Sequence, residues 1–293
     1  MFAFSKSKHM LIFDNKLALT NHLKSILSKN AYVGFVPTMG ALHNGHLSLV
    51  QESVGNNQIT VVSIFVNPTQ FNNPEDLAKY PRSLDSDIEK IKTISDQIIV
   101  YAPTVFDIYE KETVSEQFDY DGLENQMEGK FRPGHFNGVG TIVKKLFEIV
   151  QPNNAYFGEK DFQQLQIVRK MVKKHSINVN IVVCPIFREK NGLAMSSRNE
   201  RLSTEERNKA AILFETLQKV YEMYQNGTIP VNKIKDWVAK KFKQNIVFDL
   251  EYFEIADEET LISCKRKNKT KTFRAFIAVF INNIRLIDTI SLK

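Results

Sequence analysis

Short apolar runs alternate with longer amphipathic stretches over the first 185 residues of the chain. The runs are rich in Val, Ile and Phe, which is typical of strands buried on both faces of a parallel sheet. They cover residues 32–36, 59–66, 97–101, 155–157 and 179–184. This alternation predicts an α/β domain built on a parallel sheet.

The clearest helix of this domain is predicted from Asn137 to Val150. Val139, Ile142 and Leu146 fall on one stripe of a helix with 3.6 residues per turn, and Lys145 faces away from it. We interpret this segment as a helix that packs on the sheet.

The pattern changes after Arg198. Ser203 and Glu206 form a capping-box signature that predicts a helix running through Leu217, and a second helix is expected near residues 231–242. Residues 249–255 and 273–281 are predicted to be antiparallel strands, joined through the basic segment 265–271. We expect this basic segment to be a solvated hairpin, with a phosphate contact as the less favoured alternative. A separate, smaller α+β unit is therefore predicted here.

Composition places the chain among globular proteins, with 43% hydrophobic and 25% charged residues. The net charge of +6 is spread along the chain, so it does not indicate a nucleic-acid partner. Cys184 and Cys264 are too few for a disulfide framework, which favours a cytoplasmic location. No apolar run approaches the roughly 18 to 20 residues of a membrane-spanning helix, so no membrane partner is expected. Residues 1–10 lack the features of a signal peptide, and we interpret them as either a frayed start or residues added for expression.

Two histidines three residues apart follow the first of these apolar runs. His43 and His46 lie in the segment PTMGALHNGH, which leads from that run into an amphipathic stretch. We expect both rings in the first turn of a helix, where free N–H groups and the helix dipole favour an anion and a neutral imidazole. Gly45 leaves room for a nucleotide close to the backbone. If both imidazoles must be neutral hydrogen-bond donors, binding of the nucleotide should weaken toward acid pH, where the rings become protonated. Two histidines on a surface helix by chance are the alternative.

A second polar group follows another predicted strand, in the segment FGEKDFQQ of residues 157–164. Ligands of open parallel sheets bind at this carboxyl edge. Lys160 offers a cation for a polyphosphate, Asp161 an acceptor for ribose hydroxyls, and Gln164 an amide that donates and accepts. The alternative is a surface ion pair between Lys160 and Asp161.

Two further segments carry polar side chains at positions that suit a ligand. Ser196, Ser197 and Arg198 can donate to phosphate oxygens, although a polar linker between domains would have the same composition. Gln70 lies just past a predicted strand and needs partners if it is buried, and a hydroxylated substrate would supply them. An ordinary surface turn at Asn67 and Pro68 is the alternative for that segment.

Six segments of the chain carry a resemblance to a known family, namely PTMGALHNGH, NPTQF, DLAKYPRSLDSD, RPGHFNGVGTIVKKLF, GEKDFQQL and MSSRN. They resemble the pantothenate synthetase family, whose members are also called pantoate–β-alanine ligases. The resemblance is dense over roughly residues 30 to 207 and loose at residues 252–255 and 285–288. Residues 1–9 have no counterpart. Within the wider nucleotidyl-transferring superfamily, His43 and His46 resemble the HIGH signature, and MSSRN stands where related enzymes carry a KMSKS-like loop, with Arg198 in place of a Lys.

The resemblance implies a Rossmann-like domain over residues 1–185 that binds ATP and pantoate, followed by a smaller α+β lid domain over residues 186–293. It implies that the carboxylate of pantoate attacks the α-phosphorus of ATP, which is bound with Mg²⁺, and that the amine of β-alanine then attacks the acyl adenylate to give pantothenate. A carboxylate with a pKa of about 4 is already ionised at neutral pH, so the first step requires orientation and charge neutralisation. A homodimer through the larger domain is also implied.

Residue roles follow from the same resemblance. The catalytic residues would be His43, His46, Lys160 and Arg198, with His46 as the acid. Gln70 and Gln164 would hold pantoate, and Gln70 would also lie near β-alanine. Phe71 and Phe162 are expected to be wall and core residues, and His135 is either a structural turn residue or a ligand contact. The residues expected to contact ATP, with Phe187 acting through its backbone, are Met39, Gly40, Ala41, Leu42, His43, Asn44, Gly45, His46, Gly158, Glu159, Lys160, Asp161, Phe187, Met195, Ser196, Ser197 and Arg198.

Two other functions fit parts of the pattern. A nucleotidyltransferase of the same superfamily would join a nucleotide to a phosphorylated acceptor and retain it in the product. An adenine-nucleotide-binding regulatory or electron-transfer module would be consistent with the sheet alone.

Overall fold

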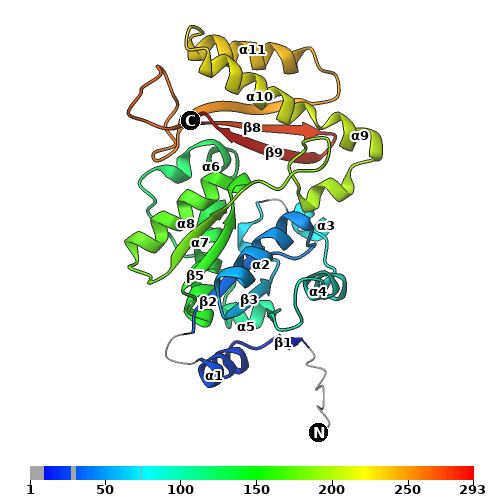
Figure 1. Ribbon diagram of the computed structural model, residues 1–293, viewed down its shortest axis with the longest axis vertical. Coiled ribbons are helices and arrows are strands. Elements are labelled where there is room, and N and C mark those ends of the chain that lie inside the picture. Colours follow the sequence, from blue (N-terminus) through cyan, green and yellow to red (C-terminus); the bar gives the residue numbers. More distant parts are fainter. Residues whose placement is uncertain (1–9, 28–30, 73) are drawn as a thin grey trace. The chain divides into compact units, whose positions relative to one another are not determined.

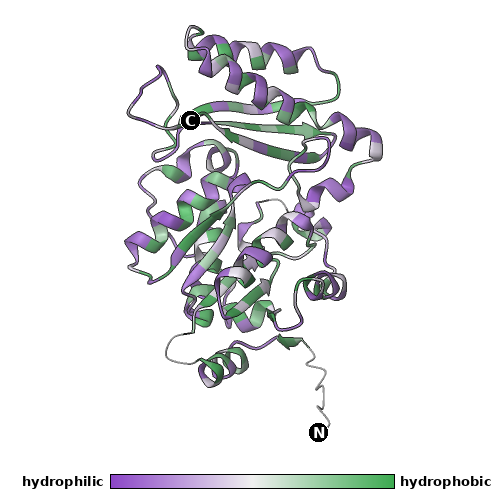
Figure 2. Ribbon diagram, in the orientation of Figure 1, coloured by the Kyte–Doolittle hydropathy of each residue, from purple (hydrophilic) through white to green (hydrophobic). Residues whose placement is uncertain are grey.

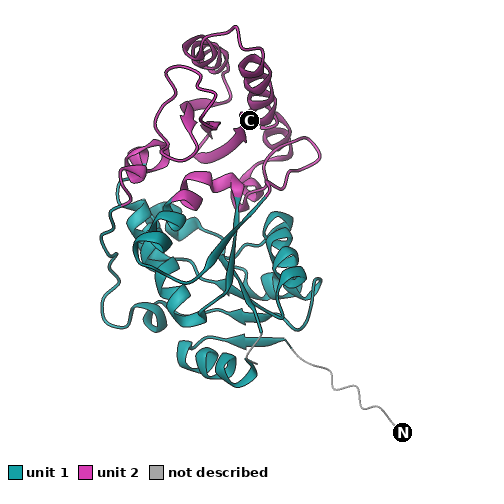
Figure 3. Ribbon diagram, turned by 60° about the vertical axis from the view of Figure 1, so that its left-hand side comes forward, with its two compact units in different colours: residues 1–119, 132–158, 167–184 teal, residues 120–131, 159–166, 185–293 magenta. Residues whose placement is uncertain are grey.

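The computed structural model describes residues 10–27, 31–72 and 74–293. The chain divides into two compact units, coloured separately in Figure 3. Unit 1 comprises residues 1–119, 132–158 and 167–184, and unit 2 comprises residues 120–131, 159–166 and 185–293. The domain division after residue 185 and the lid role of residues 186–293 stay predictions.

Unit 1 contains a six-stranded sheet with strand order β1-β4-β3-β2-β5-β6, in which every neighbouring pair is parallel (Figure 1). This confirms the predicted parallel sheet. Figure 2 shows apolar residues concentrated along these strands. The strands are β1 (Leu11–Phe13), β2 (Val33–Thr38), β3 (Ile59–Ile64), β4 (Ile99–Tyr101), β5 (Asn154–Gly158) and β6 (Asn180–Cys184).

Helices cover both faces of this sheet. Alternate residues of a strand point to opposite sides, and here both sets are apolar and need to be covered. Val36 and Val62 belong to a buried cluster with α2 and α4, whereas the ring of Phe35 packs on Phe147 of α7. The prediction for residues 137–150 is confirmed, and α7 begins two residues earlier. The helices wholly or partly in unit 1 are α1 (Lys16–Ile26), α2 (Asn44–Asn56), α3 (Pro74–Lys79), α4 (Leu84–Lys92), α5 (Val105–Tyr109), α7 (His135–Val150) and α8 (Phe162–Lys174), with the 3-10 turn η1 (Pro68–Gln70).

The interpretation of residues 1–10 as a frayed start is wrong for Met10, which is 8% exposed and lies in the core of unit 1. Residues 1–9 lie outside the described part of the chain. The strand β1 and the helix α1 were not predicted, since β1 has only three residues and takes its order from pairing with β4. Asn15 caps α1 by accepting the N–H of Ala18.

Unit 2 is built on the antiparallel sheet β7-β8-β9, which confirms the predicted α+β unit. One face packs on α10 and α11 through a single apolar cluster. The elements within unit 2 are η2 (Leu123–Asn125), α6 (Met127–Phe131), η3 (Glu159–Asp161), η4 (Ser197–Arg201), α9 (Thr204–Lys209), α10 (Ile212–Gln225), α11 (Val231–Lys243), β7 (Asp249–Asp257), β8 (Phe273–Ile281) and β9 (Ile284–Ser291). The first turn of α8, up to Gln166, also belongs to this unit.

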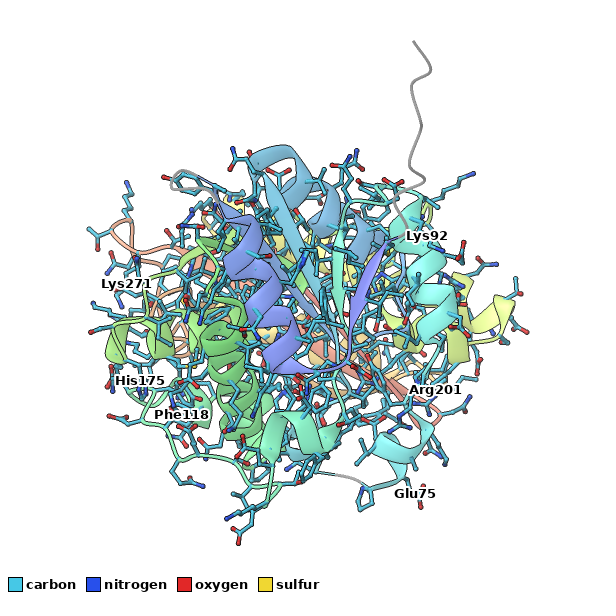
Figure 4. All side chains as sticks on the ribbon, turned by 90° about the horizontal axis from the view of Figure 1, so that it is seen from below. Glu75, Lys92, Phe118, His175, Arg201 and Lys271 are labelled. Carbon is cyan, nitrogen blue, oxygen red and sulfur yellow. The ribbon has the colours of Figure 1, made fainter. Side chains whose placement is uncertain are left out.

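Two predictions for unit 2 need correction. The capping box at Ser203 and Glu206 is present, but the expected single helix is two, because α9 ends at Lys209 and α10 begins at Ile212. The strand β9 was not predicted, although it pairs with β8 along its whole length. The basic segment 265–271 is mostly exposed, as expected, and Lys271 projects outward in Figure 4.

The second face of this sheet carries buried ion pairs. Phe273 and Ala275 point toward the apolar cluster, so Arg274 between them points to the opposite side. The segments 120–131 and 159–166 reach this side of the sheet through Glu128, which pairs with Arg285, and Glu159, which pairs with Arg274. These contacts explain why both segments belong to unit 2. No helix in the described part of the chain is long and apolar enough to cross a membrane.

Candidate active site

The two histidines lie where β2 leads into α2. His43 is the N-cap of α2, and its Nδ1 accepts the N–H of Gly45 at 3.1 Å. In return, Nδ1 of His46 accepts the N–H of His43 at 3.4 Å, and the ring centroids are 4.1 Å apart. Since Nδ1 is the acceptor in both rings, each neutral imidazole carries its proton on Nε2.

This geometry modifies the expectation in one respect. His43 is the cap and does not lie in the first helical turn, and the imidazoles themselves accept two of the backbone N–H groups expected to bind an anion. This turn therefore offers the Nε2–H groups of the two imidazoles as hydrogen-bond donors. The helix dipole adds an electrostatic field that favours an anion.

Asp87 supports the turn that precedes the histidines. Its carboxylate is fully buried and accepts the N–H groups of Ala41, at 2.8 Å, and Leu42, at 2.7 Å. Gly40 and Ala41 both have positive φ angles, of 81° and 49°. An added Cβ at Gly40 would lie 3.1 Å from Asp87 Oδ2, so the tight turn favours glycine there. The side chain of Leu42 lies in the core, and its carbonyl accepts from Nζ of Lys90 at 2.7 Å.

Gln70 is buried, at 8% exposure, so the alternative of an ordinary surface turn is wrong. Its Oε1 accepts from Nδ2 of Asn67 at 3.2 Å, and its Nε2 points to the thioether of Met39 at 2.7 Å. A thioether is a weak acceptor. The Gln70 amide therefore has a fixed orientation and a donor that a ligand oxygen would satisfy better.

Asn67 takes its own orientation from Tyr109. The Tyr109 hydroxyl donates to Asn67 Oδ1 at 2.6 Å, which turns Nδ2 of Asn67 toward Gln70. Burial raises the pKa of Tyr109 more than its hydrogen bonds with Thr69 and Asn67 lower it, so this hydroxyl stays protonated. A chain of neutral hydrogen bonds thus runs from Tyr109 to Gln70.

Of the two roles expected for His135, its contacts match that of a structural turn residue. It is buried at the start of α7, where its Nδ1 donates to the carbonyl of Gln70 at 2.7 Å and its Nε2 lies 3.2 Å from Arg132. Gly138 allows α7 to approach η1 closely, because an added Cβ would lie 2.4 Å from the carbonyl oxygen of Thr69.

Lys160 and Asp161 follow β5 in the chain, within η3. They form the ion pair of the alternative interpretation, with Lys160 Nζ 3.0 Å from Asp161 Oδ2. The lysine side chain is only 17% exposed, so this is not a fully solvated pair. An added Cβ at the preceding Gly158 would meet no atom within 4 Å, which leaves open space beside the end of β5.

The residues around Lys160 are fixed by contacts within unit 2. Gln163 donates to the carbonyls of Leu123 and Gln126, each at 2.9 Å, and Phe162 is a buried core residue, as expected. Gln164, the residue expected to bind pantoate, is half-buried. The carboxylate of Glu159 pairs with Arg274 at 2.5 Å.

Residues 187–201 form a packed hairpin and turn inside unit 2, so the interpretation of this segment as a polar linker is wrong. The N–H of Met195 donates to the carbonyl of Phe187 at 3.0 Å, and Ser196 caps η4 by accepting from the N–H of Arg198. Glu189 accepts from Asn199 Nδ2 at 2.8 Å, which ties the hairpin to η4.

A buried ion pair joins the hairpin to β9. Arg188 donates to both carboxylate oxygens of Asp288, at 2.7 and 3.0 Å, and its guanidinium lies 3.9 Å from the ring centroid of Phe214. Burial raises the pKa of Asp288, against the opposing effects of Arg188 and of the charge on Lys160.

A model of the pantoate-β-alanine ligase family matches residues 11–291. The chain belongs to this family. A pantothenate synthetase of Flavobacterium psychrophilum is 64% identical over 284 residues, which are 97% of this chain and 100% of that protein. The crystal structure of the pantothenate synthetase of Thermus thermophilus has a TM-score of 0.87 and 37% identity, and the match covers 97% of this chain and 99% of that one. A ligase of Francisella tularensis, solved with β-γ ATP and β-alanine, has a TM-score of 0.75 and 36% identity, covering 97% and 98% of the two chains.

Membership of the ligase family confirms the function expected from the sequence, the ATP-dependent condensation of pantoate with β-alanine. It sets aside both alternatives, the nucleotidyltransferase and the non-catalytic nucleotide-binding module. Within unit 1, the rings of His43 and His46 contact each other, and Gln70 contacts Met39, which lies four residues before His43 in the chain. Lys160 and Arg198 lie on separate segments of unit 2.

Sequence reasoning missed the residues of this ligase that hold the expected site residues in place. Asp87 is part of a segment quoted only for its resemblance, and nothing in its local pattern indicated that it accepts two backbone N–H groups. No local sequence pattern indicates the role of four other residues either, because each acts through partners far away in the chain. They are Tyr109, Arg188, Arg274 and Asp288.

Proposed function

We propose that this ligase works through a pantoyl adenylate. A carboxylate oxygen of pantoate attacks the α-phosphorus of ATP, the bond to the β-phosphate oxygen breaks, and pyrophosphate leaves. The nitrogen of β-alanine then attacks the acyl carbon, the bond to the AMP oxygen breaks, and the amine gives up a proton. The Francisella tularensis ligase was solved with β-γ ATP and β-alanine, which supports ATP and β-alanine as substrates.

The paired imidazoles are the observation that carries this proposal. Both rings are fixed by the capping box with the proton on Nε2, at the positive end of α2. In the proposed mechanism these groups donate to phosphate oxygens as charge moves onto pyrophosphate, and His46 acts as the acid. Fixed donors that need no rearrangement are the most effective way to stabilise such charge.

Gln70 takes the role of binding pantoate, since its Nε2 is aimed by Asn67 and now meets only a thioether. Gln164 is proposed as a second amide for pantoate. In unit 2, Lys160 and Arg198 supply charge for the phosphates, Ser196 and Ser197 supply uncharged donors, and Asp161 accepts from ribose hydroxyls.

The other ATP contacts proposed from the resemblance are mostly made by backbone. Glu159 is proposed to contribute through its main chain, because its carboxylate is held by Arg274. Phe187 acts in the same way, whereas Leu42 contributes by shaping the turn, since Asp87 and Lys90 hold its N–H and carbonyl. Met39, Gly40, Ala41, Asn44, Gly45, Gly158 and Met195 complete this set.

Mg²⁺ enters as part of the nucleotide substrate in this proposal. Among the described residues no group of three or more His, Cys, Asp or Glu side chains is arranged to hold a metal ion. Mg²⁺ is commonly bound through substrate phosphates and waters with few protein ligands, so we assign it no residue.

A homodimer through the larger domain and a cytoplasmic location remain part of the proposal. Both cysteines are buried thiols, and burial raises the pKa of Cys184 to about 11, so it is a poor nucleophile.

Light scattering on the purified protein should give twice the mass of one chain. A mass of about 33.7 kDa would contradict the dimer.

Isotope transfer tests the adenylate. Pantoate labelled with ¹⁸O in its carboxylate should deliver one ¹⁸O to the phosphate of AMP, because the attacking oxygen leaves with AMP. Exchange of labelled pyrophosphate into ATP should require pantoate and proceed without β-alanine. AMP without label, or exchange that is equal without pantoate, would contradict the proposal.

A further inference from the structure

Arg274 is the most deeply buried cation in the part of the chain that the structure describes, at 2% exposure. It lies on β8, on the face that points away from α10 and α11. Its guanidinium donates to Glu159 at 2.5 Å and to Glu258 at 3.1 Å, and it lies 4.1 Å from the ring centroid of Phe162.

Burial of a cation with two carboxylates is not the cheapest way to fill a sheet surface. Apolar residues of similar size often give equal or greater stability, so a buried ion pair needs another explanation than stability alone. One of the two carboxylates belongs to Glu159, the residue directly before Lys160. The three residues of η3 form less than one turn of α-helix and cannot fix their own geometry.

The strand β9 makes the corresponding contact with the second segment. Asp288 is 3% exposed and accepts from both terminal nitrogens of Arg188. Arg188 also donates to the carbonyl of Gly192 at 3.0 Å, inside the hairpin that leads to Arg198. An added Cβ at Gly192 would lie 2.5 Å from the ring of Phe214, so the hairpin is closely packed there. In addition, β9 packs against both η3 and η4.

We infer that Arg274 and Asp288 are positioning residues for the adenylation step. Arg274 fixes the η3 turn that carries Lys160, and Asp288 acts through Arg188 to fix the hairpin that carries Arg198. The C-terminal sheet is thus part of the machinery that orders the two phosphate-binding segments. This inference rests on the proposed roles of Lys160 and Arg198.

The two partners of Arg274 provide a matched test. Glu159→Gln and Glu258→Gln each remove one carboxylate from the same guanidinium and keep the shape of the side chain, but only Glu159 belongs to η3. We expect Glu159→Gln to raise the KM for ATP about tenfold, through loss of one charge-assisted hydrogen bond. The KM for β-alanine should stay within about twofold, and Glu258→Gln should leave both constants within about twofold.

Asp288→Asn tests the second contact in the same way. It should raise the KM for ATP and lower the rate of pantoate-dependent pyrophosphate exchange, while the KM for β-alanine is unchanged. Asp249→Asn, at the exposed start of β7, is the control. Circular dichroism and thermal melting of all four variants confirm that they are folded.

Equal effects of Glu159→Gln and Glu258→Gln on the KM for ATP would overturn the inference, since both would then report only on stability. Lys160→Met separates the inference from the proposed function. If Lys160→Met abolishes exchange and Glu159→Gln does not alter it, the positioning role is wrong and the role of Lys160 stands. If Lys160→Met retains full exchange, the proposed role of Lys160 fails and the inference falls with it.

Discussion

The turn that carries His43 and His46 and the turn that carries Lys160 are held in place by different kinds of contact. The cap of the first is made by its own residues, because the two imidazoles accept N–H groups only two and three positions away, and the distant Asp87 holds only the two residues that precede the cap. The second depends on an ion pair with Arg274, which is 115 residues distant from Glu159. A donor can thus be ordered by a helix cap, whereas a cation on a short turn needs charged partners from another part of the fold.

Loss of Arg274 is expected to have the largest effect on stability. Arg274→Ala leaves the carboxylates of Glu159 and Glu258 without their buried cation, so we expect the free energy of unfolding to fall by about 3–5 kcal/mol. Urea denaturation measures this change. Arg266→Ala, at an exposed position of the basic segment, is the control and should stay within about 0.5 kcal/mol of the parent protein. A loss of less than about 1 kcal/mol in Arg274→Ala would remove the distinction between the two turns.

Lys160→Met tests the chemical role of the remotely supported turn. The variant keeps much of the side-chain volume and removes the charge that is proposed to stabilise pyrophosphate. We expect kcat to fall about 100-fold. Steady-state release of AMP measures it, with Lys219→Met, on an exposed ion pair of α10, as the control. An unchanged kcat would assign Lys160 to the ion pair with Asp161 alone.

His43→Asn separates the two tasks of the locally supported turn. Asparagine is among the best N-cap residues, so the helix cap and the melting temperature should be kept. It lacks the Nε2–H donor, and pyrophosphate exchange should therefore fall about tenfold or more. His43→Ala should lose both exchange and about 1 kcal/mol of stability. Full exchange in His43→Asn would show that the imidazole serves only as a cap.

The contrast between the turns also explains what the sequence could predict. The parallel sheet, α7 and the capping box at Ser203 follow from patterns within a few residues, and so does the approach of His43 to His46. The support of Lys160 does not, because a single Arg among the apolar residues of β8 has no local mark that indicates its partner. The break between α9 and α10 and the existence of β9 likewise arise from packing within unit 2, which no short pattern records.

Tyr109→Phe should have a smaller effect, confined to pantoate. The substitution removes the hydroxyl that orients Asn67, and through it the amide of Gln70. We expect the KM for pantoate to rise about fivefold, the equivalent of one neutral hydrogen bond, with the KM for ATP unchanged. Tyr221→Phe, at a partly exposed position of α10, is the control. An equal rise in both constants would indicate a general loss of structure.

The smallest effect concerns Asp257, at the end of β7. Burial raises the pKa of this carboxyl, but hydrogen bonds from Thr260 and the nearby Lys271 lower it more, so the pKa lies below its ordinary value. The resulting stability is present above the ordinary pKa and is lost as the pH falls through the lowered one. Asp257→Asn should therefore cost about 1 kcal/mol at pH 7 through weaker hydrogen bonds, and the difference in the free energy of unfolding from the parent protein should narrow as the pH falls below the ordinary pKa of 3.8. Urea denaturation at each pH measures it, and a difference that is independent of pH would contradict the sign.

The central claim is that a helix cap orders the turn of His46, whereas a distant ion pair orders the turn of Lys160. A crystal structure with a non-hydrolysable ATP analogue and pantoate bound tests it most directly. We expect Nε2 of His46 and Nζ of Lys160 at about 3 Å from phosphate oxygens, with the capping box of α2 and the pair between Arg274 and Glu159 unchanged. Lys160 would then have left Asp161 for the ligand while Arg274 stayed in place. A complex in which Arg274 releases Glu159 to bind the ligand, or in which Lys160 remains on Asp161, would contradict the account.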